Sequence, residues 1–385
     1  MRAPIGARFL TAAEAAERLG VKRATLYSYV ARGHLSGIGA SRAGGHLYSE
    51  DDVERLRSRA AAHKGHAGAA SGALRFGEPV LSSSITRIDP RGPAYRGVLA
   101  TRLVDEGRPF EAAVELLVGG SARPVGRPPR ALAAALGRAR AAARGPSTLA
   151  VFGVLATHAA SVEDPATLLA WTAAFAGPQP TTNEPRCVAD ALRESFRLPA
   201  RGAVVQALDA ALVLLADHEL NASAFACRVA ASTGAPAKIA VLAGLAALAG
   251  HRHGEACLEA HAMLRAATRP LALLRARGPS VPGFGHPLYP DGDPRATRLL
   301  AVVATLAPRS KLHGRLRALE VAANSLGLRP NVDLALAALT LVLRAPPAMG
   351  PTLFAVGRMA GLFAHALEQR AQGVLLRPRA RYVGP

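Results

Sequence analysis

Helical periodicity of the apolar residues is the feature that most limits what this chain can fold into. Beyond residue 84, apolar residues recur roughly every three or four positions in one stretch after another, and prolines and glycines separate the stretches. Strand-like alternation is scarce, apart from a possible hairpin around Ile85 to Tyr95. The pattern predicts a mainly α domain of about 300 residues. We expect helices at 109–118, 131–143, 147–160, 165–176, 203–217, 222–232, 236–249, 254–266, 294–306, 311–326, 332–343 and 351–370.

The composition of the chain predicts a large hydrophobic core and gives a strong positive charge. The chain has 385 residues, of which 50% are apolar but only 4% are aromatic, so its core must rely on Ala, Leu and Val. The formal net charge is +20, and nearly all basic residues are arginines. This charge could attract nucleic acid, anionic ligands or a membrane surface. We favour the simpler interpretation that arginine takes the surface role of lysine at most positions.

The cysteines and the apolar runs indicate a cytoplasmic protein. Cys187, Cys227 and Cys257 are widely spaced and form no CxxC pair, so neither a disulfide framework nor a structural zinc site is expected. The N-terminus carries no signal-peptide pattern. The longest apolar run, 239–250, has 12 residues, whereas a membrane-spanning helix needs roughly 20. We therefore expect a cytoplasmic location and no membrane partner.

The first 59 residues form a separate predicted unit. Thr11 and Glu14 fit a capping box ahead of a short helix, and a second helix is expected over 22–31. A glycine pair at 44–45 permits a tight turn before a short strand and a third helix. This order of elements indicates a small domain that folds apart from the long helical region.

This unit resembles the winged helix-turn-helix domain of excisionase and MerR-type proteins. The resemblance covers TAAEAAERLGVKRATLYSYVARG (11–33) and GGHLYSEDDVERL (44–56). It implies that the second helix enters the DNA major groove and that the glycine turn lies near phosphates, so DNA is a candidate partner through residues 8–58. The alternative is a small helical adaptor that binds protein. Residues 60–82, rich in Ala, Gly, Ser and His, are predicted to be a flexible linker. The candidate DNA-binding residues are Lys22, Arg23, Thr25 and Ser28.

Three histidines and one carboxylate lie in four short motifs of the helical region. Together with several arginines, they suit the removal of a proton beside a carbonyl and the joining of the resulting carbanion to a dianionic acceptor. His251 and His253 could suggest a metal, but no acidic or cysteine partner lies at ligand spacing, so we predict no metal site. The motifs are ADHELNASAF (216–225), GHRHGEA (250–256), GFGHPLYPDGDPRA (283–296) and RPNVD (329–333).

From about residue 84 to its end, the chain resembles citrate synthase. The four motifs occur in that family's order, and several consecutive motifs at compatible spacing are far more specific than any one of them. The resemblance extends to YRGVLATRLVDEGRPFEAAVELLVGG (95–120), LFAVGRMAG (353–361) and LLRPRARYVG (375–384). It implies a large helical domain formed by 83–253 and 345–385, and a small helical domain formed by 254–344.

The resemblance also implies the catalytic roles. Asp333 would be the general base that takes a proton from acyl-CoA, and His253 would stabilise the enol of the thioester. His286 would polarise the keto group of oxaloacetate. Oxaloacetate and acyl-CoA would be the substrates, and neither a metal nor a redox cofactor is expected.

Substrate binding is assigned in the same way. His218, Arg295 and Arg358 would hold the carboxylates of the keto acid, because planar arginines bind carboxylates bidentately and stay charged when buried. Arg377 matches an arginine that reaches the site of a neighbouring subunit in this family. A homodimer is therefore implied.

Some positions depart from the family pattern near the expected acyl-CoA pocket. Glu255 and Cys257 stand where small residues and asparagine are usual, Arg329 replaces an aromatic, and 334–337 are apolar. Glu255 could place a second negative charge near the thioester, or it could point outward at a helix start. These departures leave the acyl chain length open.

Three functions remain possible from the sequence. The first is condensation of acetyl-CoA with oxaloacetate and water to give citrate and CoA, or of propionyl-CoA to give 2-methylcitrate. The second is a transcriptional regulator that uses the citrate-synthase body as a metabolite sensor. The third gives the front domain a role in dimerisation or protein interaction. A hybrid is also possible, because catalysis and DNA binding would use different domains.

Overall fold

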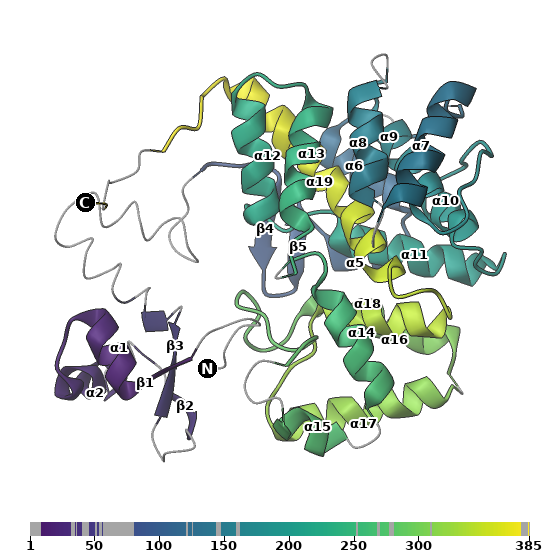
Figure 1. Cartoon of the computed structure of the whole chain (residues 1–385). Helices are drawn as coiled ribbons and strands as arrows, with labels where there is room; N and C mark the ends of the chain where they lie inside the picture. The colour runs from purple at the N-terminus through teal and green to yellow at the C-terminus, as the bar shows by residue number, and fades with distance from the viewer. Residues whose placement is uncertain are drawn as a thin grey trace.

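The structure of the chain is a computed structural model. Within the residues that it describes, a small N-terminal unit and a helical body each have a hydrophobic core of their own (Figure 1). The described residues are 9–31, 35, 37–40, 46–50, 52–53, 56, 81–120, 122–124, 126–143, 148–158, 162–251, 253–267, 270–276, 281–308, 310–378 and 384.

Among the described residues, the N-terminal unit combines helices α1 and α2 with a three-stranded antiparallel sheet. The predicted third helix lies only partly within the described residues, where Glu50, Asp52, Val53 and Leu56 are helical. The strand order is β1-β3-β2. Strands β1 and β2 were not expected from the sequence, because three or four residues are too few for a strand pattern to emerge. The elements are β1 (Phe9–Thr11), α1 (Ala12–Leu19), α2 (Arg23–Ala31), β2 (Gly37–Ala40) and β3 (His46–Ser49).

The predicted capping box forms at the start of α1. The Thr11 hydroxyl accepts from the Glu14 N–H, and the Glu14 carboxylate accepts from the Thr11 N–H at 2.7 Å. Two predicted parts, the glycine turn at 44–45 and most of the linker, lie outside the described residues. The core of the unit contains Ala15, Ala16, Leu26, Leu35, Tyr48 and Val53.

The body begins with a three-stranded antiparallel meander, which confirms the predicted hairpin. It consists of β4 (Thr86–Asp89), β5 (Gly92–Tyr95) and β6 (Val98–Leu99). Tyr95 is fully buried, and its hydroxyl donates to the carbonyl of Val213 at 2.8 Å. This bond ties the meander to the helix that leads into the first histidine motif.

Helices make up the rest of the body, so the mainly α prediction is confirmed. Three helices were not expected, namely α5, α10 and α15, since six to eight residues carry too little periodicity to stand out. The helices are α5 (Ala100–Asp105), α6 (Phe110–Val118), α7 (Arg130–Ala142), α8 (Thr148–His158), α9 (Pro165–Ala176), α10 (Val188–Ser195), α11 (Gly202–Leu215), α12 (Ala222–Ser232), α13 (Ala237–Leu248), α14 (Ala256–Ala266), α15 (Pro270–Ala276), α16 (Pro294–Leu306), α17 (Lys311–Ser325), α18 (Val332–Val342) and α19 (Met349–Gln372).

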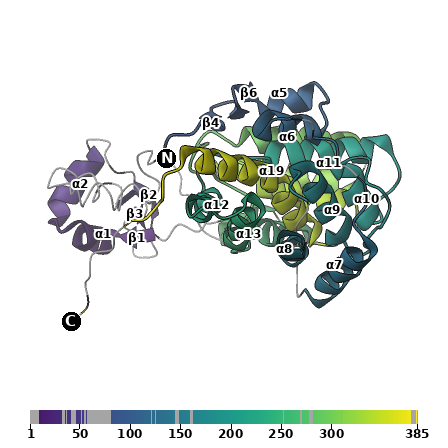
Figure 2. The same ribbon diagram turned by 90° about the horizontal axis from the view of Figure 1, so that it is seen from above.

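The long helix α19 is the central element of the body. It is yellow in Figures 1 and 2, and it packs against α6, α9, α11, α12 and α13. Two glycines let α11 and the loop after it approach closely. A Cβ on Gly357 would lie 3.0 Å from Leu215 Cβ, and one on Gly361 would lie 2.2 Å from Asp217 Oδ1. Only glycine fits at 361, so this contact sets the distance between α19 and the first histidine motif.

Helices α14 to α18 lie together in the lower part of Figure 1. Helix α18 packs against α14, α16 and α17, while α16 also contacts α11 and α18 contacts α19. The motif loops therefore meet where these helices join the rest of the body. The predicted domain boundaries at residues 253/254 and 344/345 stay predictions.

Candidate active site

Two of the three predicted histidines lie side by side with a tyrosine that the sequence analysis did not single out. The rings of His218 and His286 are 5.1 Å apart in an edge-to-face arrangement. Tyr289 lies 5.1 Å from the His286 ring, and its hydroxyl is 3.3 Å from His218 Nε2. Tyr289 follows His286 by three residues in the same loop, so it was part of the predicted motif. The sequence did not show that its side chain would lie against the two histidines.

Burial keeps these histidines neutral. Burial and then the nearby Arg295 guanidinium lower the pKa of His286 to about 4, while the charge of Asp293 opposes this shift. The pKa of His218 is lowered well below its ordinary value, first by burial and then by Arg295. The Leu288 N–H donates to His286 Nδ1 at 3.2 Å. The proton of the neutral His286 ring therefore lies on Nε2, which can donate to a substrate oxygen.

His253 is held by the end of another helix. Its Nε2 lies 3.0 Å from the hydroxyl of Ser223, the second residue of α12. That hydroxyl donates to the side-chain oxygen of Asn221, which caps α12, at 2.6 Å. Its single proton is used there, so His253 Nε2 carries the ring proton and donates to the Ser223 oxygen. Rotation of the Ser223 hydroxyl towards Nε2 would move the ring proton to Nδ1. Burial, aided by the charge of Arg358, lowers the pKa of His253 to about 4.

Arg295 is buried and locked to a neighbouring carboxylate. Asp293, the N-cap of α16, accepts from Arg295 Nε at 3.0 Å and from Nη2 at 2.9 Å. The same carboxylate accepts from the Val332 N–H at 3.1 Å, which joins the start of α16 to the start of α18. The Arg295 guanidinium also lies 5.7 Å from the centre of the Tyr289 ring. Asp293 therefore orients the cation beside the histidine cluster.

Arg358 brings a second buried cation from α19. Its Nε donates to the Leu215 carbonyl at 3.0 Å, and its guanidinium lies 5.1 Å from the centre of the Phe354 ring. Phe354 is also 5.9 Å from the His253 ring. Burial lowers the pKa of Arg358 to about 10, so the group stays charged at neutral pH. Phe354 thus lies near both Arg358 and His253.

Asp333 is a carboxylate without a fixed partner on one oxygen. Its Oδ1 is buried and has no hydrogen-bond partner among the described residues. Burial raises the pKa of Asp333 to about 7, with Arg295 opposing the shift and Asp293 adding to it. A carboxyl group with a pKa near neutrality, in a buried setting, can take up a proton at physiological pH.

The loops that carry His286 and Asp333 are bound to each other. The Gly285 N–H donates to the Arg329 carbonyl at 2.8 Å, and the Asn331 N–H donates to the Gly283 carbonyl at 2.9 Å. The Asn331 side chain donates to the Gly285 carbonyl at 3.0 Å and accepts from the Asp333 N–H at 3.0 Å. Asn331 therefore caps α18 and fixes the spacing of the two loops.

The departures from the family pattern have different settings. Glu255 is partly buried at the N-cap of α14, where its side chain makes no capping bond. Cys257 is buried, and its pKa is raised well above the ordinary value by burial and then by the charge of Asp333. The apolar residues 334–337 lie in the core of the body. These apolar side chains keep water away from the start of α18, where Asp333 lies.

Five predicted residues lie outside this cluster. Arg377 is exposed in the segment that follows α19. The other four belong to the N-terminal unit: Lys22 precedes α2, while Arg23, Thr25 and Ser28 lie on it. Lys22 and Arg23 are exposed, whereas Thr25 and Ser28 are partly buried.

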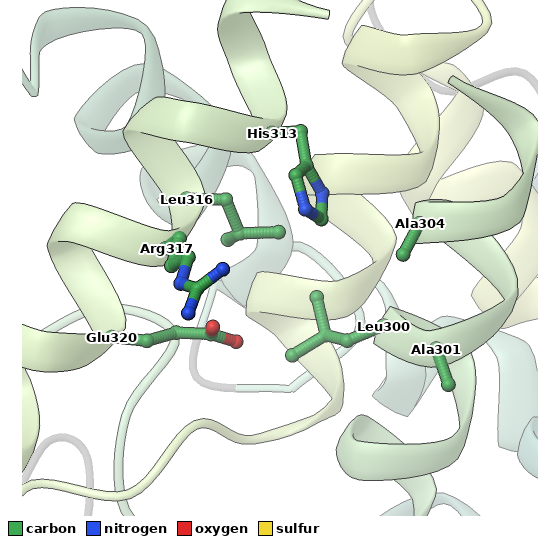
Figure 3. A pocket seen from close by; sticks show the side chains of 7 residues that line it. All are labelled: Leu300, Ala301, Ala304, His313, Leu316, Arg317 and Glu320. Atoms are coloured by element: carbon green, nitrogen blue, oxygen red, sulfur yellow. The ribbon is translucent and has the colours of Figure 1, made fainter. Parts of the chain in front are cut away.

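A pocket of about 300 Å³ lies between α16 and α17, and none of the predicted site residues lines it (Figure 3). Arg317, Glu320 and His313 line it together with small apolar residues, and burial raises the pKa of Glu320. No group of three or more His, Cys, Asp or Glu side chains that could hold a metal occurs in the described part of the chain. Among the described helices, none combines the length and apolar character needed to span a bilayer.

Comparison with known proteins identifies both parts of the chain. Residues 139–379 match the model of the citrate synthase C-terminal domain, and residues 9–60 match a helix-turn-helix domain. The chain is 37% identical over 193 residues to putative citrate synthase 2 of Mycobacterium tuberculosis H37Rv, covering 47% of this chain and 52% of the relative. It is 35% identical over 191 residues to citrate synthase 2 of Bacillus subtilis, covering 47% and 51%. The chain thus spans about half the length of the curated relatives it matches.

The fold has a counterpart among solved structures. The citrate synthase of Thermoplasma acidophilum, solved as a ternary complex with carboxymethyl coenzyme A and oxaloacetate, superposes with a TM-score of 0.68. The match covers 80% of this chain and 94% of the other at 24% identity, so it reports on the fold. The family model covers well over half of the chain and includes every histidine motif. This chain, with a helix-turn-helix domain at its front, belongs to the citrate synthase family.

Proposed function

We propose that the body catalyses the condensation of acetyl-CoA with oxaloacetate and water to give citrate and CoA. The observation that carries this proposal is the pair of neutral histidines, His218 and His286, close to the buried charges of Arg295 and Arg358. Asp333, whose Oδ1 has no partner among the described residues, interacts electrostatically with the same Arg295. Arg295 and Arg358, with His218, would bind the dianionic keto acid. The charge pattern favours a small acidic acceptor over a neutral one.

The chemistry divides among three residues in this proposal. Asp333 takes a proton from the thioester methyl group. At the same time His253, with the Ser223 hydroxyl turned towards its Nε2, donates its Nδ1 proton to the thioester oxygen, which yields the enol. The enol carbon attacks the keto carbon, and the enol hydroxyl returns its proton to His253 as the thioester carbonyl re-forms. His286 donates its Nε2 proton to the keto oxygen as the new bond forms. Water then cleaves the thioester and releases CoA. No metal or resident cofactor is needed, because these groups supply both the base and the charge stabilisation.

The deciding experiment measures release of free CoA thiol from acetyl-CoA, with and without oxaloacetate. The wild type should release thiol only when oxaloacetate is present. Asp333→Asn should lower the rate by about 10²- to 10⁴-fold, which is the usual contribution of a general base. Because Asn keeps the size of Asp, oxaloacetate binding by calorimetry should persist. A folded wild type that releases no thiol from acetyl-CoA or propionyl-CoA would overturn the proposal.

Propionyl-CoA is the alternative acyl donor, and it would give 2-methylcitrate. Cys257 and the apolar residues after Asp333 line the surroundings of the base and make them apolar. One extra methylene on the thioester changes the binding free energy at such a surface by only about 1–3 kcal/mol. Comparison of kcat/KM for the two thioesters at the same oxaloacetate concentration separates the two reactions.

We further propose a cytoplasmic homodimer in which Arg377 reaches the site of the partner subunit. Arg377 is exposed, and the neighbouring Val374 and Leu375 are 61% and 57% exposed although apolar. Exposed apolar side chains beside a binding arginine are typical of a segment that a second subunit covers. Sedimentation at several protein concentrations tests the assembly.

A second activity is DNA binding by the N-terminal unit, with the citrate-synthase body as metabolite sensor or as active enzyme. The exposed Lys22 and Arg23, together with Tyr27 at 53% exposure, favour contact with a nucleic-acid backbone. The test is a genomic pull-down followed by gel shift with the recovered sequence. Binding should weaken steeply with salt and should be lost in Lys22→Ala and Arg23→Ala. If no salt-sensitive DNA binding appears, the unit is a protein-interaction element instead.

A further inference from the structure

A buried chain of polar side chains runs behind the keto-acid site. Arg228 of α12 is fully buried, and so are His365 of α19 and Asp217 of the first histidine motif. Arg228 Nε donates to His365 Nδ1 at 3.0 Å, and His365 Nε2 lies 3.3 Å from Asp217 Oδ1. None of these three residues has a role in the proposed chemistry. Buried polar groups are retained at a cost in desolvation, so a connected set of this kind calls for an explanation.

Arg228 selects the form of His365. An arginine Nε always carries a proton, so His365 Nδ1 must offer its lone pair. The proton of the neutral ring then lies on Nε2, which is 3.3 Å from Asp217 Oδ1 but is not aligned as a hydrogen-bond donor to it. The far side of the guanidinium is held as well: Nη1 donates to Gln369 at 3.1 Å and Nη2 pairs with Glu368. Arg228 is therefore fixed by α19 and in turn presents His365 to Asp217.

Asp217 shapes the turn on which His218 stands. Its Oδ2 accepts from the Glu219 N–H at 3.1 Å. Glu219 has a φ of 57°, a left-handed conformation that non-glycine residues keep only when their surroundings enforce it. His218 lies between these two residues, so the direction of its side chain depends on the Asp217 carboxylate.

The same carboxylate interacts electrostatically with the second arginine. Burial by itself would raise the pKa of Asp217, but the neighbouring His365 and then the charge of Arg358 hold it below the ordinary value. Arg358 precedes His365 by about two turns on the same face of α19. The missing Cβ of Gly361, between them, leaves the space that Asp217 occupies. One carboxylate thus acts on both groups that would bind the keto acid, on His218 through the turn and on Arg358 through its charge.

We propose that Arg228 and His365 are positioning residues for keto-acid binding: through Asp217 they hold His218 and Arg358 in place. This inference rests on the proposed function, because it assigns the task of the network to that site. It predicts that breaking the network weakens the binding of oxaloacetate and leaves the binding of the thioester unchanged. Neither residue touches the substrate.

Two breaking variants and one conservative variant test the proposal. Arg228→Met and His365→Leu fill the space without hydrogen bonds. Each should raise KM for oxaloacetate about tenfold, while KM for acetyl-CoA changes less than about twofold. His365→Gln keeps an acceptor towards Arg228 and a donor towards Asp217. It should therefore restore KM for oxaloacetate to within about threefold of wild type.

A matched control separates positioning from general stability. Arg193→Met breaks another partly buried arginine pair, with Asp190 on α10, which is not joined to the site. It should lower the thermal midpoint without moving either KM. If Arg228→Met and His365→Leu fail to fold, Glu368→Gln removes the charge at the far end of the network and should raise KM for oxaloacetate about threefold.

Three results would overturn the proposal. One is an unchanged oxaloacetate KM in folded Arg228→Met, or in Glu368→Gln if the others do not fold. Another is an equal loss in both KM values, and the third is a His365→Gln variant as impaired as His365→Leu. Calorimetric titration with oxaloacetate repeats the comparison without turnover. A wild type that binds oxaloacetate but releases no CoA would contradict the proposed function alone, and the variants would still decide the role of the network.

Discussion

At the scale of single residues, the protonation of Asp333 should set the pH dependence of the reaction. Burial raises its pKa to about 7, and a general base works only when deprotonated. We expect kcat/KM for acetyl-CoA to fall by about tenfold per pH unit as the pH drops below about 7. The measurement is the pH profile of oxaloacetate-dependent thiol release. A profile that stays level down to about pH 5 would contradict the assignment.

The same burial means that ionised Asp333 lowers the stability of the folded state. Its pKa rises on folding from 3.8 to about 7, so the folded state binds more protons in this interval. Stability contributed by this group is complete below pH 3.8 and is lost as the pH rises through about 7. Asp333→Asn mimics the protonated acid, so it should melt at a higher temperature than wild type at about pH 8 and at a similar temperature at about pH 4.

Ser223 should act on the reaction through His253. The Ser223 hydroxyl lies 3.0 Å from His253 Nε2 and can hold the ring with its proton on Nδ1. Ser223→Ala should lower kcat about tenfold, because His253 loses the hydroxyl that orients its ring and can hold its proton on Nδ1, while KM for oxaloacetate stays unchanged. Steady-state kinetics measure both values. Ser325→Ala, at the exposed end of α17, is the matched control and should have no effect.

At the scale of elements, the start of α16 combines a helix cap with an orienting ion pair. Asn is as good an N-cap as Asp, so loss of charge alone should not weaken a cap. Asp293→Asn, however, leaves Arg295 buried without its counter-charge. It should lower the free energy of unfolding by about 3–5 kcal/mol and raise KM for oxaloacetate. Urea unfolding and kinetics test this.

Helix α9 offers the control for that experiment. Asp164 caps α9 through the Thr167 N–H at 2.8 Å and lies far from the site in sequence. Asp164→Asn should change the unfolding free energy by less than about 0.5 kcal/mol. Equal effects of the two substitutions would mean that Asp293 serves only as a cap.

At the scale of the whole molecule, the proposed dimer predicts complementation between two inactive variants. Arg377→Ala removes the residue given to the partner's site, and Asp333→Asn removes the base. When the two are mixed and subunits exchange, half of the dimers are heterodimers, and each has one site with both residues intact. About a quarter of wild-type activity should return. Native mass spectrometry monitors the subunit exchange. If heterodimers form but no activity returns, Arg377 lies outside the site.

The sequence determined more of the fold than of the site. Apart from α10 and α15, the helices from α6 to α19 followed from periodicity and Pro/Gly punctuation. The Thr11 capping box also formed as predicted, because such signals lie within a few neighbouring residues. The short α5, α10 and α15 and strands β1 and β2 were missed, since tertiary contacts rather than local pattern sustain them. The order of the motifs identified the candidate residues, although Tyr289, Asp293 and Ser223 were passed over.

Only the tertiary structure decided how these residues act. Arg228 and His365 are 137 positions apart, and no local pattern connects them or relates them to Asp217. The pKa of Asp333 depends on what surrounds it in space, and the tautomer of His286 depends on a backbone N–H fixed by a loop. Sequence alone determines which groups are present and which helices carry them. Packing sets their distances and their desolvation, and these physical quantities control both charge and proton position.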